Sequence, residues 1–251
     1  MEAAKSKRIL KLFTNSINHL LWPAVCINCR WPITDSNDKL CNNCWGELLA
    51  CTTGSCCPRC GRTISAGGIV DNACPACQGQ DFHFDALVGC GIYGGALRSM
   101  ILAFKNSRCE LASTLGGIAQ TAFHSSGFAY KVDYFVPVPL HWRKRLVRGY
   151  NQSTLIAKIL CTNGKKLNTD LVRIRNTAAQ PSMSSPAARA RNVADAFAVR
   201  KGQDFTNKTI CLIDDIKTTG ATLNECAKTL KAAGAKYVYA LVLAVADQNP
   251  G

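Results

Sequence analysis

The chain has 251 residues, of which 47% are hydrophobic and 18% charged, a composition that excludes disordered and collagen-like proteins. Lysine and arginine total 30 against 16 acidic residues, which gives a formal net charge of +14. A basic surplus favours polyanionic partners such as nucleic acid, anionic lipid or phosphorylated metabolites. No apolar run in the sequence approaches the roughly 18 residues of a transmembrane helix. The length suits one medium domain and one small domain.

The N-terminal segment 1–23 has apolar residues at helical spacing: Ile9, Phe13, Ile17, Leu20 and Leu21. Polar residues interrupt this stretch and no small-residue cleavage site follows, so we expect no secretory signal. We predict an amphipathic helix that packs on its own protein, with a basic membrane-surface helix as the alternative. The predicted location is the cytoplasm, with association to the inner face of the membrane left open.

Cysteines are concentrated near the N-terminus, where eleven of the fifteen precede residue 91. Eight of them form C-x2-C pairs: Cys26/Cys29, Cys41/Cys44, Cys57/Cys60 and Cys74/Cys77. Two such pairs supply four thiolates, which is typical of structural Zn²⁺. We expect a tandem zinc-ribbon module over 24–82 with two zinc ions, because this segment has little apolar periodicity and needs a metal to fold. Sequential and interleaved pairing both remain open, and disulfides or an iron–sulfur cluster are the less favoured alternatives.

The remaining part, 83–251, alternates apolar strands with helices. Strands are predicted at 84–93, 133–140, 208–214 and 237–245, and helices at 96–105, 111–124, 152–160 and 221–233. Strands that are apolar on both faces and alternate with helices are typical of a parallel sheet covered on both sides. The predicted fold class is therefore α/β, a parallel sheet flanked by helices that follows the cysteine-rich module.

The strand at 208–214 ends in two adjacent carboxylates, Asp214 and Asp215, and leads into a helix through Lys217, Thr218, Thr219, Gly220, Ala221 and Thr222. A strand end directs such carboxylates into the crevice at the carboxyl edge of the sheet. A helix N-terminus offers N–H groups and a positive dipole end to a phosphate. We predict a phosphate loop in which the carboxylates bind ribose hydroxyls or a metal. The alternative is a helix start that the threonines only cap.

These motifs resemble the phosphoribosyltransferase signature, and nearly the whole chain resembles the competence-associated ComF family. The resemblance rests on the paired cysteines, on the run Arg148-Gly149-Tyr150-Asn151-Gln152 and on the Asp-Asp-x2-Thr-Thr-Gly-Ala-Thr loop. It implies a phosphoribosyltransferase type I-like domain that binds 5-phosphoribosyl-1-pyrophosphate, with Mg²⁺ as a second cofactor. Asp214 and Asp215 would then hold the ribose hydroxyls, and Thr218 to Thr222 the 5-phosphate.

The same resemblance places the loop near Leu140, His141 and Arg143 beside the pyrophosphate. It also makes 173–191 a mobile loop that closes over the reacting centre. Lys105, at the end of the helix predicted at 96–105, is a further candidate phosphate partner. Four cations gather within six residues: Arg143, Lys144, Arg145 and Arg148. They fit three roles equally well, namely pyrophosphate neutralisation, nucleic-acid binding and a solvated helix face.

Two functional hypotheses follow. The first is an enzyme that transfers phosphoribosyl to an unknown acceptor, with a link to DNA uptake and competence implied by the family resemblance. The second is a non-catalytic adaptor that binds single-stranded DNA or DNA-uptake proteins and retains the ligand site only as a sensor. Turnover of the ligand separates the first hypothesis from the second, which predicts salt-sensitive binding of single strands.

Overall fold

The structure is a computed structural model that describes residues 24–33, 39–64, 68–161, 164–177 and 185–246. The chain forms two compact units, 1–50 and 51–251. The predicted domain limits, 24–82 and 83–251, follow sequence composition, whereas this division assigns half of the cysteine-rich segment to the larger unit. The helix predicted at 1–23 lies outside the described residues. Among the described residues, no helix combines the length and apolar character needed to cross a membrane.

The smaller unit is organised around the first two C-x2-C pairs. The first knuckle is closed by an antiparallel bridge between Val25 and Pro32. Helix α2 (Asn42–Thr52) carries the second pair at its start and continues into the larger unit, and its buried residues are Cys44 and Leu48. In the described part of this unit so few buried apolar side chains provide little core, as expected for a metal-dependent module.

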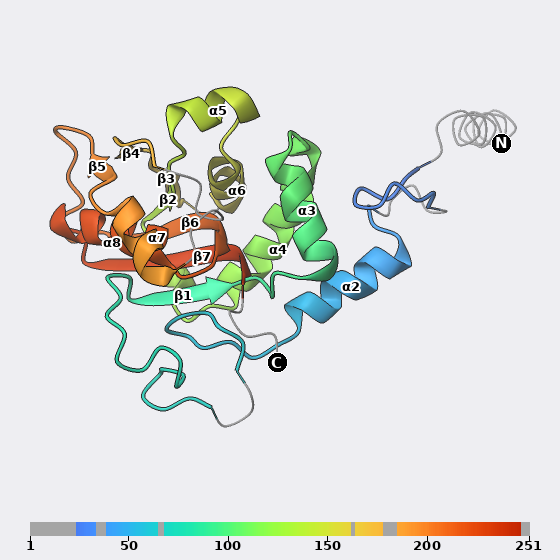
Figure 1. The fold of residues 1–251 in the computed structure, drawn as a ribbon, viewed down its shortest axis with the longest axis horizontal. Helices are drawn as coiled ribbons and strands as arrows, with labels where there is room; N and C mark the ends of the chain where they lie inside the picture. The colour runs from blue at the N-terminus through green and yellow to red at the C-terminus, as the bar shows by residue number, and fades with distance from the viewer. Residues whose placement is uncertain (1–23, 34–38, 65–67, 162–163, 178–184, 247–251) are drawn as a thin grey trace, which may run out of the picture. The chain divides into compact units, whose positions relative to one another are not determined.

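The larger unit is built on a five-stranded parallel sheet with the order β1-β7-β6-β2-β3 (Figure 1). The strands are β1 (Ala86–Gly89), β2 (Tyr134–Pro137), β3 (Lys166–Leu167), β6 (Thr209–Lys217) and β7 (Tyr237–Val245). Every pairing in this sheet is parallel. The central strands β6 and β7 are buried along most of their length, because side chains on both faces are covered.

Helices cover both faces of this sheet. The chain steps in opposite directions after β2 and after β6, so right-handed crossovers place the following helices on opposite faces. Helix α6 (Gln152–Leu160) packs with α4 (Ala112–His124) on one face, and α8 (Ala221–Ala232) packs with α7 (Pro186–Val193) on the other. The predicted α/β fold class with a parallel sheet and flanking helices is confirmed.

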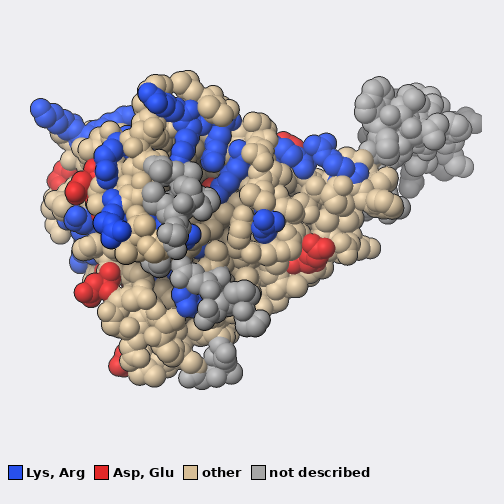
Figure 2. Space-filling model, in the orientation of Figure 1, with Lys and Arg blue, Asp and Glu red and all other residues tan. Residues whose placement is uncertain are grey.

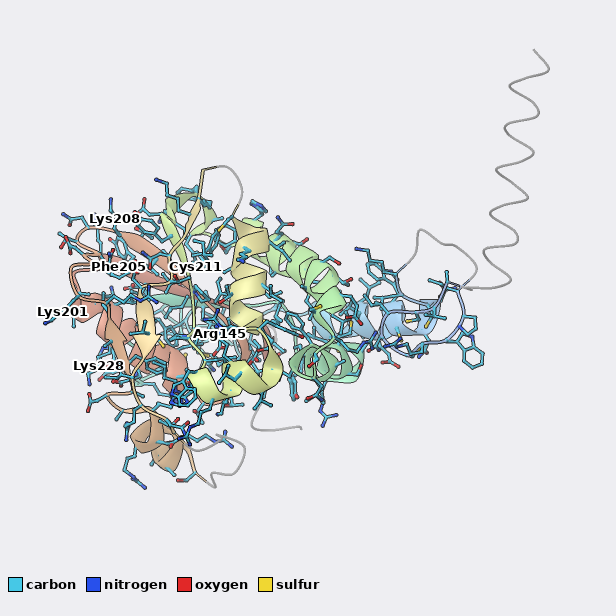
Figure 3. The ribbon with its side chains drawn as sticks, turned by 90° about the horizontal axis from the view of Figure 1, so that it is seen from above. Arg145, Lys201, Phe205, Lys208, Cys211 and Lys228 are labelled. Atoms are coloured by element: carbon cyan, nitrogen blue, oxygen red, sulfur yellow. The ribbon has the colours of Figure 1, made fainter. Side chains whose placement is uncertain are left out.

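The remaining elements lie before and after these helices. Helix α3 (Gly95–Lys105) leads through the 3-10 turn η1 (Cys109–Leu111) into α4, and η2 (Ala129–Lys131) precedes β2. Helix α5 (Trp142–Arg148) follows β2, and β4 (Leu171–Arg173) pairs with β5 (Phe197–Val199) in a separate antiparallel sheet. Cys211 of β6 and Phe205, in the loop before this strand, are both buried (Figure 3).

The second pair of cysteine knuckles packs directly on the sheet. Leu87 of β1 donates its N–H to the Pro58 carbonyl at 3.1 Å. Gly61 has a φ of +73°, and a Cβ there would lie 2.2 Å from the Leu87 side chain. Leu87 shares its core cluster with Leu223 and Leu230 of α8. The second ribbon therefore covers the α8 face of the sheet beside β1, and Gly61 permits the close approach.

Candidate ligand site and metal centres

The eight knuckle cysteines form two groups of four: Cys26, Cys29, Cys41 and Cys44, and Cys57, Cys60, Cys74 and Cys77. Within each group the four sulfur atoms all lie within 4.8 Å of one another. Neighbouring Sγ atoms are 3.6 Å apart in the pair Cys29/Cys41 and 3.7 Å apart in the pair Cys60/Cys74. A tetrahedral site with Zn–S bonds of about 2.3 Å requires sulfur separations of about 3.8 Å. The residues fit structural zinc, and the pairing is sequential, so the interleaved alternative is wrong.

The backbone of the second cluster favours a thiolate at one of its ligands. Burial raises the pKa of Cys57, but the backbone N–H groups of Cys60, Arg59 and Cys74 outweigh burial and bring the pKa to about 7. The N–H of Cys74 lies 3.3 Å from the Cys57 sulfur. Burial and the neighbouring charge of Cys57 raise the pKa of Cys60. Metal binding must therefore drive deprotonation at the remaining ligands.

The predicted carboxylate pair lies near the carboxyl end of β6, which pairs with β7 as far as Lys217, three residues beyond the predicted strand limit of 214. Asp214 Oδ1 accepts hydrogen bonds from the Asp215 N–H at 2.9 Å and from Ser153 Oγ at 3.3 Å. Asp215 Oδ2 forms an ion pair with Lys105 Nζ at 3.0 Å. Burial, followed by the charge of Asp215, raises the pKa of Asp214 to about 7. The pair therefore carries fewer than two negative charges near neutral pH and is ready to accept hydroxyl donors or a cation.

The segment after these carboxylates turns into α8. Gly220 is the N-cap residue, with a φ of +83°, and makes no side-chain cap. The N–H of Ala221 lies 3.4 Å from Thr219 Oγ1, so the capping role considered for the threonines is present in a weak form. Lys217 is buried, and its side chain packs across Gly220. The helix dipole and the lysine both add positive potential at this turn.

Asn151 connects the end of β2 to the start of α6. Its side-chain Nδ2 donates to the Val138 carbonyl at 3.0 Å, and its Oδ1 accepts from the Ser153 N–H at 3.1 Å as the N-cap of α6. The cap fixes Ser153 in the first turn, where its hydroxyl reaches Asp214. Asn151 therefore supports the carboxylate pair through one intermediate residue.

Tyr150 and Gln152 connect the same helix start to the end of α3. The Tyr150 hydroxyl and Gln152 Nε2 both donate to the Phe104 carbonyl. Phe104 directly precedes Lys105, the ion-pair partner of Asp215. The run of residues 148–152 that carried the family resemblance thus acts within the described structure as a junction that holds two neighbours of the carboxylates in position.

A basic surface covers the predicted pyrophosphate loop. His141 caps α5 by accepting at Nδ1 from the Arg143 N–H at 3.4 Å. Burial and the charges of Arg143, Arg173 and Lys144 lower the pKa of His141, so its ring is neutral near pH 7. Basic side chains gather over this part of the molecule (Figure 2), and Arg145 projects from the same helix (Figure 3).

Arg173 links the two halves of the candidate site. It lies at the end of β4, where its guanidinium covers the Phe197 ring at 5.3 Å and bonds to the Thr177 hydroxyl. Its charge acts on both His141 and Asp214. The predicted closing loop 173–191 begins at this residue, and its segment 178–184 lies outside the described residues.

The predicted site residues come together in part. Lys105 joins Asp215 directly, whereas Leu140, His141 and Arg143 lie on the α5 side and are related to Asp214 through Arg173. Sequence reasoning did not single out Ser153 as a partner of Asp214. The only sequence signal for Ser153 was its place directly after Asn151-Gln152, in the first turn of a predicted helix.

Several similar proteins match most of the chain. A family model described as a double zinc ribbon domain matches residues 17–78. Competence protein F of Haemophilus influenzae is 28% identical over 220 residues, which cover 85% of this chain and 93% of the relative. DNA utilization protein YhgH of Salmonella typhi is 30% identical over 226 residues, which cover 86% of this chain and 94% of the relative. Competence protein ComFC of Bacillus subtilis is 26% identical over 201 residues, which cover 77% of this chain and 78% of the relative.

Solved structures show more distant likenesses. A purine phosphoribosyltransferase from Pyrococcus horikoshii is 17% identical, with 53% of this chain and 73% of that chain covered and a TM-score of 0.33. A glutamine phosphoribosylpyrophosphate amidotransferase from Bacillus subtilis is 17% identical, and the match covers 53% of this chain and 26% of that chain with a TM-score of 0.35.

The relatives span the same two parts that the structure contains, the paired cysteine clusters and the parallel sheet. The similarity to these relatives extends continuously through both parts of the chain, so the two parts occur together in the relatives as well. The chain belongs to the ComF family of competence-associated proteins, and its residues 17–78 match the double zinc ribbon model.

Proposed function

We propose that this chain binds 5-phosphoribosyl-1-pyrophosphate at the carboxyl edge of the sheet and transfers its phosphoribosyl group to an acceptor. The observation that carries the proposal is the pair Asp214 and Asp215 near the carboxyl end of β6, held by Ser153 and Lys105. The N-cap of α8, Gly220, follows five residues after Asp215. The carboxylates suit the ribose hydroxyls, and the turn suits the 5-phosphate.

The cations of the site suit the leaving group. In the transfer, the bond between C1 of the ribose and the pyrophosphate oxygen breaks while a bond from C1 to the acceptor forms. Pyrophosphate leaves with the bonding electron pair and needs positive charge around it. His141 and Arg143, at the start of α5, and Arg173 supply donors and charge on that side. Mg²⁺ would neutralise further charge, with the ligand's oxygens and the two aspartates as its available partners.

The decisive experiment removes the carboxylate charges without changing their shape. Asp214→Asn together with Asp215→Asn should weaken binding of the ligand by roughly two to four orders of magnitude, because hydrogen bonds to charged groups contribute about 1.5 to 3 kcal/mol each. Isothermal titration calorimetry measures this directly. The matched control is Asp195→Asn, whose carboxylate is 88% exposed and pairs with Lys228; its affinity should equal that of wild type.

Affinity that stays level or rises in the double variant contradicts the proposal, because the pair would then repel phosphate rather than bind the sugar. Binding without turnover has a different meaning. If wild type binds the labelled ligand but releases no pyrophosphate with any acceptor in a metabolite screen, the protein is a sensor of the ligand rather than a transferase.

The second candidate function is binding of single-stranded DNA, and helix α5 specifically favours it. Trp142 is 59% exposed on this helix with the Arg143 guanidinium 5.2 Å from its ring. Proteins that bind single strands combine exposed aromatic rings, on which bases stack, with cations that follow the backbone. The relatives named for DNA utilization and competence agree with such a role, either directly or through DNA-uptake proteins. Thiolate zinc clusters suit a reducing compartment, so we place either function in the cytoplasm.

A further inference from the structure

A cavity of about 110 Å³ lies between the second zinc ribbon and the phosphate loop, within the larger unit. Both sides contribute to its wall: Cys60, Arg62 and Cys77 from the ribbon, and Lys217, Thr218 and Thr219 from the loop. Two of the four zinc ligands of this cluster therefore line the same space as the predicted phosphate contacts. A water molecule occupies about 30 Å³ in the liquid, so the cavity has room for a group of phosphate size.

The chemistry of the wall matches a phosphate monoester. Arg62 and Lys217 contribute positive charge, and Thr218 and Thr219 contribute hydroxyl and backbone donors. Arginine is well suited to phosphate because its planar fork donates two parallel hydrogen bonds. The dipole of α8 adds positive electrostatic potential at the N-terminus of this helix. None of these four side chains is negative, whereas the other end of the site has Asp214 and Asp215. The zinc ligands Cys60 and Cys77 lie on the same wall, where the metal would offset part of their thiolate charge.

The ribbon holds Arg62 in place through its backbone. The N–H of Cys57 donates to the Arg62 carbonyl at 2.8 Å, so the arginine belongs to the knuckle that the metal closes. The knuckle is in turn fixed to the rest of the unit, because Arg59 donates to the Gln80 carbonyl at 2.6 Å and Leu87 donates to Pro58. Loss of the metal would free Cys57 and Cys60 to move, and the Arg62 side chain would then no longer be held in position.

We propose that the second zinc ribbon forms a wall of the ligand site and that Arg62 is a binding residue for the 5-phosphate end of the ligand. This inference rests on the proposed function and adds to it a residue and a metal dependence that the phosphate-loop motif does not contain. It also gives the two zinc clusters different roles. The second cluster supports the ligand site, whereas the first does not line the cavity among the described residues.

The test replaces Arg62 by residues of graded charge. Arg62→Met keeps much of the aliphatic bulk and removes the guanidinium, so calorimetry should show binding of both 5-phosphoribosyl-1-pyrophosphate and ribose 5-phosphate weakened by about 10- to 100-fold. Arg62→Lys should recover part of this loss. Inorganic pyrophosphate, which lacks the sugar phosphate, should bind with unchanged affinity. The matched control is Lys201→Met, which removes one exposed positive charge outside the cavity wall, with a change of less than about twofold expected.

The metal arm uses one variant from each cluster. Cys60→Ser, which should lose only the second zinc, should weaken ribose 5-phosphate binding, whereas Cys29→Ser, which should lose only the first, should bind as wild type does. By reciprocity, saturating ribose 5-phosphate should raise the zinc affinity of Cys29→Ser several-fold in equilibrium competition with a chelator and leave the zinc affinity of Cys60→Ser unchanged. Zinc content and circular dichroism of each variant serve as folding controls.

The outcomes separate this inference from the proposed function. If Arg62→Met binds both sugar phosphates like wild type while the double aspartate variant does not bind, the inference is wrong and the proposed function stands. If wild type binds neither 5-phosphoribosyl-1-pyrophosphate nor ribose 5-phosphate, both the inference and the proposed function are wrong. An equal loss for inorganic pyrophosphate would show a general field effect and would overturn the assignment of Arg62 to the 5-phosphate end.

Discussion

Asp214→Asn should stabilise the protein, and the gain should grow with pH. Burial and the charge of Asp215 raise the pKa of Asp214 from 3.8 to about 7 in the folded protein. Between these values the folded state holds a proton that the unfolded state has released, so stability falls as pH rises through this window. An asparagine cannot ionise and therefore avoids this loss.

The size of the effect follows from the shift. At 1.36 kcal/mol per pH unit, a rise from 3.8 to about 7 corresponds to about 4 kcal/mol above pH 7, of which about half is already lost at pH 5.5. Relaxation around the charged group reduces these figures, so we expect the gain from Asp214→Asn to increase by about 1 to 2 kcal/mol between pH 5.5 and pH 8. For a chain of this length that is roughly 3 to 6 °C in Tm.

Thermal unfolding of zinc-saturated protein at about pH 5.5 and about pH 8 measures this difference. The control is Asp204→Asn, because hydrogen bonds from Thr206 lower the pKa of Asp204 and its loss should bring no gain at high pH. A Tm difference between wild type and Asp214→Asn that is the same at both pH values would refute the reasoning. It would show that the carboxyl is ionised or solvated at the end of β6.

Three further predictions concern the metal clusters and the basic helix. Metal analysis should find two zinc ions per chain, and Cys29→Ser or Cys60→Ser should each leave one; a chain with no zinc would overturn the cluster assignment. Gly61→Ala should destabilise the larger unit by about 1 to 3 kcal/mol more than Gly79→Ala in denaturant titrations, because both glycines have positive φ but only Gly61 faces a side chain within 4 Å. Neutralising the four cations of 143–148 should reduce the salt slope of single-stranded DNA affinity by about 3, and an unchanged slope would remove α5 from DNA binding.

The sequence predicted the central sheet well because its elements carry strong local patterns. The predicted helix at 152–160 and strand at 237–245 match α6 and β7 residue for residue, since α6 has apolar residues at helical spacing and β7 is a continuous apolar run buried on both faces. Helix α5 was predicted only as one of three alternatives for its cations, because none of its residues is buried and a helix without a buried face has no such pattern. The strands β3, β4 and β5 are two or three residues long, too short for an alternation to show.

The candidate site was predictable where its residues are adjacent in sequence and not where they converge from separate elements. The position of Asp214 and Asp215 at a strand end followed from the apolar strand before them. The partners Ser153 and Arg173 come from α6 and β4, and only the folded topology brings them near the aspartates. The pairing of the four cysteine knuckles could not be predicted for the same reason, because C-x2-C spacing defines each knuckle but not which other knuckle shares its zinc ion.

The pairing of β1 with β7 has a consequence for the order in which the protein folds during synthesis. The carboxylate of Asp85, next to β1, accepts from the Val238 N–H, which lies 153 residues further along the chain. At about 5 to 20 residues per second, a ribosome takes roughly 8 to 30 s to make that stretch. During this interval β1 has no partner strand, and its apolar face is a template for aggregation. The second ribbon is complete before β1 emerges, and its Pro58 carbonyl accepts a hydrogen bond from the Leu87 N–H. A zinc-loaded ribbon would therefore shield the nascent β1 until β7 has been made.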